Sequence, residues 1–597
     1  MFCAYVNPTL YRSGAVLVCV AVFSLALPHL NDSMWTDEER TMWYAGAAPQ
    51  YGPVELSTSY ERVAENLWQA PGYFLIMNRW GRAFGWSEFT MRLFSVYAAL
   101  LAVAVTYRTA TRLYNPEVGF YAAFALGINT FFIHHAHDMR TYTLNVLLTA
   151  LLLLSYVSLH RRQHVIVWYV VLLASATGLL YTHYFNAFGV AALGLYHLFT
   201  HVRRPTFWPV MGVLALSGVL FLPWLDVLLS GLSITTVDDR FVRNMSILEL
   251  INGTLSMFSN EARAIVILLA LVGIRKQRPY HRMLLFWVGL ALAGAFLASR
   301  LFPALTEVKY LMFAFPAMAV IVAVGMRQLS RMGVPAAVIM AIWFSLAIWN
   351  LYDVQAQERI QSSDWEVPLK EFRTALENRT LPTDSVMFHL AEGAEEANRN
   401  EMMDFYMYDL EVIRAVQIPS NRATPDTLYY DRVRAASERA DRVWMGYEIG
   451  RRDWRVGPVT DTILPEAGFV QCGSLQPAQN ISMSLLAVKP NRENAVTFTT
   501  PEDGTIDIFT LAPITATHEL NIGWKASSDV PPGTYSVSAQ VYDGHGMLIT
   551  HVDYGIAGSD FACVYEQLQL LAQPDEAYGV RYVVYNWQTG DRLPRDR

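Results

Sequence analysis

The sequence predicts a polytopic α-helical membrane protein that carries a water-soluble part at its C-terminal end. Of its 597 residues, 53% are hydrophobic and only 16% are charged, and the mean hydropathy is +0.23. A soluble protein of this length is normally less apolar. The apolar residues gather into repeated runs before residue 350, and many runs approach the roughly 20 residues that a helix needs to cross a bilayer.

About eleven membrane-spanning helices are expected from these runs and from the polar breaks between them. The weakest candidate is 262–274, because it is short for a span. The expected spans are 13–30, 88–110, 116–134, 141–159, 164–182, 186–201, 207–229, 262–274, 283–300, 309–326 and 333–350.

The positions of Lys and Arg predict the orientation of the bundle. Basic residues collect in alternate connections, which the positive-inside rule assigns to the cytoplasm. The N-terminus is then cytoplasmic, and an odd number of spans leaves the chain after residue 350 outside the plasma or inner membrane. The first apolar run is long and lacks a cleavage site, so we interpret it as a retained anchor. The basic residues are Arg12, Arg108, Arg112, Arg161, Arg162, Arg203, Arg204, Arg275, Lys276, Arg278, Arg282, Arg327 and Arg331.

The sequence after residue 350 predicts two folded domains, which follow a membrane domain at 1–350. Residues 351–490 mix helical and strand-like runs, which indicates a small extracytoplasmic α/β domain. Residues 491–597 contain short strands between turns, which indicates a β-sandwich, similar in fold class to carbohydrate-binding or acceptor-docking modules. The expected elements are a helix at Trp365–Glu377 and strands at Ser385–Leu390, Arg442–Glu448, Ser482–Val488, Thr497–Thr499, Thr505–Leu511, Glu519–Trp524, Thr534–Tyr542, Met547–Val552 and Val580–Trp587.

The tail also contains two cysteines, one in each predicted domain. Cys472 and Cys563 can form a disulfide in an oxidising compartment, or they can be two buried thiols. Two buried thiols are the favoured interpretation, because a disulfide requires two separate domains to bring the cysteines together.

A carboxylate pair follows the first span, within Met34-Trp35-Thr36-Asp37-Glu38-Glu39-Arg40. Adjacent carboxylates at a membrane surface can act as acid and base, or they can hold a divalent cation. An equally weighted alternative is a helix start, with Thr36 or Asp37 as the N-cap and Glu38 in the first turn.

A second group, His134-His135-Ala136-His137-Asp138-Met139-Arg140-Thr141-Tyr142, joins the third and fourth expected spans. Ionised Asp138 and Arg140 at this depth cost several kcal/mol unless they meet partners or a ligand, which favours a functional role. The three histidines are too crowded to converge easily on one zinc ion, so we predict no metal site there.

A third group lies near the mouth of the tenth expected span, at Glu307-Val308-Lys309-Tyr310. Lys309 departs from the positive-inside trend and suits a lipid phosphate, although simple snorkelling to the headgroups is an equal alternative. Tyr181-Thr182-His183-Tyr184-Phe185 resembles an interfacial aromatic belt, but His183 can also donate to a phosphate.

Together with other segments, these residues make the first 350 or so residues resemble GT-C glycosyltransferases of family 39, the protein mannosyltransferase and aminoarabinose-transferase type. The resemblance rests on the order and spacing of several short stretches. They are Asp37-Glu38, Gln69-Ala70-Pro71-Gly72-Tyr73, Gly85-Trp86-Ser87-Glu88-Phe89-Thr90-Met91-Arg92-Leu93, His137-Asp138-Met139-Arg140-Thr141-Tyr142, Tyr181-Thr182-His183-Tyr184 and Lys309-Tyr310. Three positions depart from the family pattern, namely Ala70 for Pro, Asp138 for Glu and Lys309 for Arg.

The resemblance implies inverting transfer of a sugar from a polyprenyl-phosphate donor to an extracytoplasmic protein, lipid or glycan. The implied roles are those of a catalytic base for Asp37, a support for Glu38, and an orienting group for Asp138. It also implies a substrate-binding set near the donor phosphate and a brace for the first loop at Arg92. The substrate-binding set is Arg140, Tyr142, His183, Lys309 and Tyr310.

Composition excludes other classes and leaves two alternatives. The formal net charge of −7 makes nucleic acid an unexpected partner, and the sequence contains no Walker or GxGxxG loop for a nucleotide. A transporter or flippase of lipid-linked sugars would need polar residues through the bilayer and internal repeats, neither of which is evident. A non-catalytic membrane scaffold would tolerate Asp37→Asn, whereas an enzyme would not.

Overall fold

The structure, a computed structural model, describes most of the chain. The described residues are 8–596 except 48–52, 68, 162–164, 235–245, 275–278, 302–306, 353–368, 391–400, 420–425, 449–455, 479–480, 489, 491–494, 515–517 and 569–578. Four of the basic residues used to predict orientation, Arg162, Arg275, Lys276 and Arg278, therefore lie outside the described part. So does the beginning of the helix that was expected at Trp365–Glu377.

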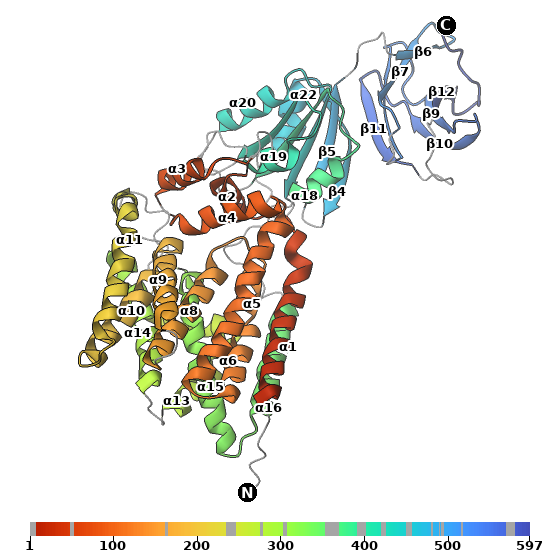
Figure 1. The fold of residues 1–597 in the computed structure, drawn as a ribbon. Coiled ribbons are helices and arrows are strands. Elements are labelled where there is room, and N and C mark those ends of the chain that lie inside the picture. Colours follow the sequence, from red (N-terminus) through yellow and green to blue (C-terminus); the bar gives the residue numbers. More distant parts are fainter. Residues whose placement is uncertain are drawn as a thin grey trace. The chain divides into compact units, whose positions relative to one another are not determined.

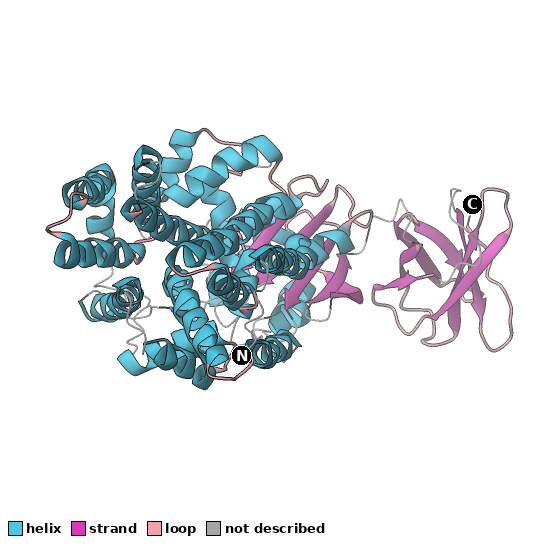
Figure 2. Cartoon of the chain, turned by 60° about the horizontal axis from the view of Figure 1, so that its bottom comes forward, coloured by secondary structure: helices cyan, strands magenta, loops and turns pink. Residues whose placement is uncertain are grey.

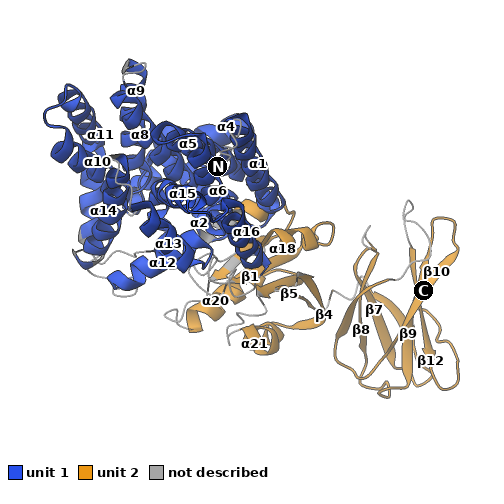
Figure 3. Cartoon of the chain, turned by 90° about the horizontal axis from the view of Figure 1, so that it is seen from below, with its two compact units in different colours: residues 1–366 blue, residues 367–597 orange. Residues whose placement is uncertain are grey.

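The chain divides into two compact units, Met1–Glu366 and Val367–Arg597 (Figure 3). Every described strand lies in the second unit, whereas the first is built from helices (Figure 2). The second unit holds both a mixed sheet and a β-sandwich. The finer division at residues 350 and 490 stays a prediction.

The first unit is a bundle of long helices with shorter helices at one end (Figure 1). We call the end where α1 stops and α8 begins the site end, and the other the opposite end. The elements are α1 Pro8–Ala26, η1 Leu27–Asn31, α2 Thr36–Ala45, α3 Leu56–Asn66, α4 Gly72–Phe84, α5 Glu88–Leu113, α6 Pro116–Gly127, α7 Thr130–Ala136, α8 Tyr142–His160, α9 Val165–Thr182, α10 Asn186–His201, α11 Phe207–Ile234, α12 Ile247–Ser259, α13 Arg263–Ile274, α14 Pro279–Leu301, η3 Val308–Ala314, α15 Phe315–Arg331 and α16 Ala336–Tyr352.

Each expected span coincides with a helix or a bent helix pair, and the protein is an integral membrane protein. Among the described residues, six helices are long and apolar enough to cross a membrane, or up to eight if each of two bent pairs is one span. The remaining candidates are shorter apolar helices, such as Ala336–Tyr352. The count of eleven spans is therefore not confirmed.

The two bent pairs stabilise each other at their breaks. α6 and α7 meet at 69°, and α12 and α13 meet at 94°. Asn129 donates to the carbonyls of Met257 and Phe258 at 2.6 and 2.8 Å, and Asn260 donates to the carbonyl of Ile128 at 3.0 Å. Backbone groups exposed by a helix break must find partners away from water. This exchange supplies such partners and fixes α7, which leads into the candidate site.

The apolar pattern of Tyr73–Phe84 predicts an amphipathic helix with Asn78, Arg79 and Arg82 on its polar face. The helix α4 confirms the helix but not the whole of that face. Asn78 is fully buried, and its amide donates to the carbonyls of Ala45 and Val54 at 2.8 and 3.2 Å. It was expected to face away from the packed side. The amide instead satisfies backbone groups of the loop that follows α2, which an isolated helical pattern cannot reveal.

The second unit contains a five-stranded sheet in the order β2-β1-β3-β5-β4 and a β-sandwich. The sandwich has a three-stranded sheet, β10-β9-β12, and a four-stranded sheet, β11-β8-β7-β6. β1 pairs in parallel with β2 and β3, and the other pairs are antiparallel. The elements are α18 Leu369–Leu376, β1 Asp384–Leu390, α19 Glu401–Met407, β2 Arg414–Pro419, α20 Asp426–Ser437, β3 Arg442–Glu448, α21 Val456–Pro458, η5 Val459–Ile463, α22 Leu464–Glu466, β4 Phe469–Ala478, β5 Ile481–Val488, β6 Ala495–Thr499, β7 Thr505–Ala512, β8 Glu519–Ala526, β9 Tyr535–Tyr542, β10 Leu548–Gly555, β11 Ala562–Gln567 and β12 Gly579–Asn586.

The mixed sheet and the sandwich are joined within this unit by a disulfide and by polar contacts. Cys472 in β4 and Cys563 in β11 are bonded, so the favoured expectation of two buried thiols was wrong. Arg379 pairs with Glu519 at 2.7 Å, and Arg442 donates to Asn521 at 3.0 Å. The cysteines meet because β4 and β11 pack side by side, a contact across 91 residues of sequence that no local pattern encodes.

We expect Cys472→Ser to destabilise the second unit by about 2–5 kcal/mol, because a crosslink restricts the unfolded chain. Thermal unfolding of the full-length protein, together with mobility in non-reducing gels, measures the effect. The control is Cys19→Ser, which removes a free cysteine. A wild-type protein whose mobility and Tm are unchanged by reductant would contradict the expectation.

Candidate functional site

Arg92 fixes the loop between α1 and α2 at the site end of the bundle. Its side chain is almost fully buried near the start of α5, and it pairs with Glu38 at 2.9 and 2.6 Å. The guanidinium also donates to four backbone carbonyls between α1 and α2, those of His29, Leu30, Asp32 and Ser33. Arg92 thus occupies the position of a brace, as the resemblance implied.

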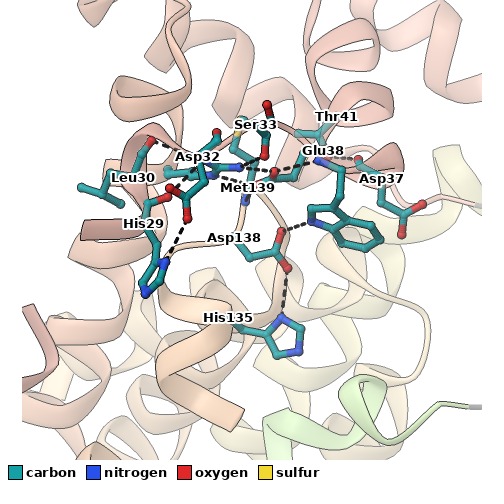
Figure 4. Close-up of polar contacts among 12 residues, drawn as sticks. His29, Leu30, Asp32, Ser33, Asp37, Glu38, Thr41, His135, Asp138 and Met139 are labelled. Atoms are coloured by element: carbon teal, nitrogen blue, oxygen red, sulfur yellow. Dashed lines mark hydrogen bonds and ion pairs between the residues drawn. The ribbon is translucent and has the colours of Figure 1, made fainter. Parts of the chain in front are cut away.

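Glu38 is the centre of this brace (Figure 4). It is 1% exposed, and its two oxygens accept from Arg92, from the backbone N–H of Met139 at 2.8 Å and from that of Trp35 at 3.3 Å. Hydrogen bonds therefore engage both oxygens of the carboxylate, which holds the surrounding backbone and Arg92 in place. The geometry favours the supporting role over a direct catalytic one.

Asp138 is held between two side chains from different elements. Its carboxylate accepts from the indole N–H of Trp35 at 3.1 Å and lies 3.0 Å from Nδ1 of His135. The carboxylate and His135 are visible together in Figure 4. Asp138 is 3% exposed, so this acid is positioned by partners on both oxygens.

Asp37 is the most accessible of the three acids, with a side chain that is 24% exposed. Its carboxylate lies 3.3 Å from Arg140 and 3.6 Å from Arg40. Arg140 also donates to the Asp37 carbonyl at 3.2 Å and to the Thr41 hydroxyl at 3.3 Å. The first turn of α2 therefore presents Asp37 beside a buried guanidinium, as a helix N-terminus favours for an acid.

Lys309 lies in the same network, near the start of η3. Its ammonium group pairs with Glu307 at 2.9 Å, and it lies 5.3 Å from the ring centre of Trp35 and 5.9 Å from that of Tyr142. Trp35 thus contacts both Lys309 and Asp138. A buried cation over two aromatic faces is stabilised by their quadrupoles, and this position differs from a lysine that snorkels to the membrane surface.

His183 and Tyr310 complete the group. Their ring centres lie 4.6 Å apart, and the backbone N–H of Phe185 donates to Nδ1 of His183 at 3.3 Å. Burial, together with the positive charges of Arg140 and Lys309, lowers the pKa of His183 to about 3. His183 is therefore a neutral imidazole at physiological pH, able to donate one N–H but not to supply a charge.

This pKa shift predicts how acid affects stability. In the unfolded chain, the histidine pKa is about 6.5. As the pH falls below that value, His183 binds a proton in the unfolded state but stays neutral in the folded state. Stability is then lost between about pH 6.5 and pH 3, and is fully present above this range. We expect the fall in Tm between about pH 7 and pH 5 to be smaller for His183→Gln than for wild type.

The matched control is His545→Gln, which changes an exposed histidine in the second unit. Equal pH dependence of Tm in wild type and His183→Gln would contradict the assignment of a neutral, buried His183.

The structure thus brings all nine predicted residues together at the site end, as a Glu38–Arg92 brace beside a network of Asp37, Asp138, Arg140, Tyr142, His183, Lys309 and Tyr310. The sequence did not single out Trp35 or His135 as partners of Asp138. For His135, the spacing of three residues from Asp138 is a local signal that could have indicated the contact. For Trp35 there is no such signal, because it lies 103 residues from Asp138 in sequence. A divalent cation at Asp37 and Glu38, one of the alternatives that the sequence left open, is not tested by these contacts.

Residues 69–225 match the family described as dolichyl-phosphate-mannose-protein mannosyltransferase. This segment contains Arg92, Asp138, Arg140 and His183, whereas Asp37 and Lys309 lie outside it. No curated protein matches the chain.

Two solved structures are similar to the chain over most of its length. ArnT from Cupriavidus metallidurans in the apo state is 14% identical, with a TM-score of 0.47, over 80% of this chain and 100% of that chain. The oligosaccharyltransferase AglB from Archaeoglobus fulgidus, in complex with an inhibitory peptide and a dolichol-phosphate, is 10% identical, with a TM-score of 0.38, over 98% of this chain and 97% of that chain. At scores this low, the likeness alone establishes no common fold.

The family match and the apolar helical bundle make part of this protein similar to membrane-embedded mannosyltransferases. Its first unit carries the segment that is similar to protein mannosyltransferases. The resemblance expected from the short sequence stretches is confirmed at this level.

Proposed function

We propose that this chain is an inverting glycosyltransferase that moves a sugar from a polyprenyl-phosphate donor to an acceptor outside the cytoplasm. One observation carries the proposal: an accessible acid, Asp37, pairs with the buried Arg140, and a second buried cation, Lys309, lies over Tyr142 in the same network. Transfer from a lipid phosphate needs a base for the acceptor and positive charge for the departing phosphate. The network combines these groups at one end of the bundle.

Asp37 is the base in this proposal, because it is the most exposed of the three acids. The acceptor oxygen or nitrogen attacks the anomeric carbon of the sugar, and its proton passes to Asp37. The bond between that carbon and the phosphate oxygen breaks, and the polyprenyl phosphate leaves with the electron pair. Attack opposite the leaving group inverts the configuration of the anomeric carbon.

Arg140 and Lys309 stabilise the phosphate as its charge grows, and the neutral His183 donates a hydrogen bond to it. Each cation has an acidic partner in the structure, Asp37 for Arg140 and Glu307 for Lys309. An arriving phosphate competes with these carboxylates for the cations. Release of Asp37 from Arg140 would free its carboxylate oxygens to accept the acceptor proton when the donor is bound.

Asp138 has a positioning role here. With its oxygens engaged by Trp35 and His135, it orients the aromatic ring that Lys309 contacts and the turn that leads to Arg140. Tyr142 and Tyr310 line the same network and provide ring faces for the sugar or for the lipid phosphate group. Glu38 and Arg92 keep the base-bearing helix in place.

The disulfide supports an extracytoplasmic location for the second unit. Disulfides persist in oxidising compartments and are rare in the cytosol, and Cys472 and Cys563 are bonded. This agrees with the orientation that the basic connections predict, in which the site end faces the same side.

The proposal is tested by incubating the purified protein in lipid vesicles with a panel of radiolabelled polyprenyl-phosphate sugars and a membrane extract as acceptor. We expect at least one donor to give a labelled product and free polyprenyl phosphate in equal amounts. Absence of transfer from every donor would contradict the proposal.

A further inference from the structure

Three histidine side chains meet at the opposite end of the bundle from the candidate site. His160 ends α8, and His197 and His201 lie one turn apart at the end of α10 (Figure 1). One ring nitrogen from each lies within 4.8 Å of the others. Because α8 runs 19 residues from Tyr142 to His160, the cluster is about 27 Å from the candidate site along this helix.

Hydrogen bonds fix which nitrogen of His160 carries the proton. Nδ1 of His160 lies 2.8 Å from the carbonyl of Tyr156 and must donate to it. The lone pair is then on Nε2, which is buried and has no hydrogen-bond partner among the described residues. A buried nitrogen lone pair without a donor costs free energy unless something binds it.

The other two rings are oriented in the same way. Nε2 of His197 lies 3.3 Å from the carbonyl of Phe207 and donates to it, which leaves the lone pair on Nδ1. Nδ1 of His201 lies 2.6 Å from the hydroxyl of Thr200, and that hydroxyl donates its own proton to the carbonyl of Tyr196. His201 must therefore donate to Thr200, so that its lone pair is on Nε2.

Each imidazole thus donates one N–H to the protein and keeps the other nitrogen as a potential ligand. Metal-binding histidines show this arrangement, because the second hydrogen bond fixes the tautomer and strengthens the ligand. Tetrahedral zinc with Zn–N bonds of about 2.0–2.1 Å needs nitrogens about 3.3 Å apart. One nitrogen of each ring already lies within 4.8 Å of the others, and rotation of the rings would be needed to bring the three lone-pair nitrogens to that separation.

Two nearby groups modulate the cluster. The Tyr156 hydroxyl lies 2.9 Å from Nδ1 of His197 and donates to it, so a metal would have to replace this hydrogen bond. The positive charge of Arg204 acts on both His160 and His201 and opposes a cation. If the histidines only packed the helix ends together, the stability of the protein would depend on Tyr156 and would not change when Arg204 is replaced.

We propose that His160, His197 and His201 form a site for a divalent transition metal that prefers imidazole ligands, with zinc as the principal candidate. Three neutral imidazoles suit zinc, nickel or copper rather than magnesium or calcium. The fourth position is open to water. The metal ties the end of α8 to the end of α10, and the site is independent of the proposed transfer chemistry.

The test uses the full-length protein in detergent, stripped with a chelator and titrated with Co²⁺ as a spectroscopic probe and with Zn²⁺ for metal content and Tm. We expect wild type to bind one ion, to show the visible absorption of four-coordinate Co²⁺ and to gain Tm with Zn²⁺. His160→Gln and His201→Gln should each weaken binding by at least about 100-fold, since losing an outer partner alone costs about 10–100-fold.

Further variants separate this site from others. Tyr156→Phe and Arg204→Gln should bind at least as tightly as wild type, because they remove a competitor and a repelling charge. Asp37→Asn and His281→Gln, a buried histidine outside the cluster, should leave the Co²⁺ spectrum unchanged. Equal binding by wild type and both cluster variants, or loss of binding only in Asp37→Asn, would overturn the proposal.

Discussion

Replacing Asp37 with asparagine is expected to lower kcat for sugar transfer by about 10²–10⁴-fold, the usual contribution of a positioned general base. Asparagine keeps the size of the side chain but cannot accept the acceptor proton. The fold should survive, because the asparagine oxygen can still accept a hydrogen bond from Arg140, which also donates to the backbone carbonyl of residue 37 and to the Thr41 hydroxyl. Initial rates with a saturating donor measure the effect.

The matched control for this variant is Glu39→Gln, which makes the same acid-to-amide change two residues further along α2. It should transfer at close to the wild-type rate. Equal kcat values for Asp37→Asn and wild type would contradict the role of Asp37 as the base.

Replacing Arg92 with methionine is expected to have the largest effect on stability, a loss of about 3–5 kcal/mol. The change removes one partner of a buried ion pair and leaves Glu38, which is 1% exposed, without its counter-charge. It also removes the donors to four loop carbonyls. Thermal unfolding in detergent, with monodispersity as a second readout, measures the loss.

A double-mutant cycle distinguishes the brace from general damage at this position. Glu38→Gln combined with Arg92→Met should cost less than the sum of the two single changes, because the second change removes a charge that is already unpaired. Arg92→Lys should be intermediate, since lysine keeps the charge but lacks the planar fork. Additive losses would contradict the Glu38–Arg92 pair as a coupled unit.

The sequence predicted elements whose signals are local. Apolar length marked the helices of the bundle, and alternation marked strands such as Thr505–Ala512. Three strands were not predicted. They are Arg414–Pro419, which is short, Phe469–Ala478, which contains a glycine and a proline, and Ala562–Gln567, which lies at a sheet edge. Their pairing depends on neighbours that are distant in sequence.

In the candidate site too, features with a local sequence signal were predicted and contacts between distant residues were not. An ionised side chain placed near a membrane is unusual enough to be identified singly, which is why Asp37, Arg140 and Lys309 were found. Contacts between residues of the site were not predicted, because Trp35 and Asp138 are 103 residues apart in sequence and Glu38 and Arg92 are 54 residues apart. The histidine cluster was overlooked for a related reason, since His160 lies on a different helix from His197 and His201.

The central claim is that the base and the phosphate-binding cations are separate parts of one site. Binding of polyprenyl phosphate to the purified protein tests it most directly, when measured for wild type, Asp37→Asn and Lys309→Met. The account predicts that Asp37→Asn binds the lipid phosphate at least as tightly as wild type while failing to transfer sugar, and that Lys309→Met binds it more weakly. Unchanged affinity in Lys309→Met, or loss of lipid-phosphate binding in Asp37→Asn, would contradict it.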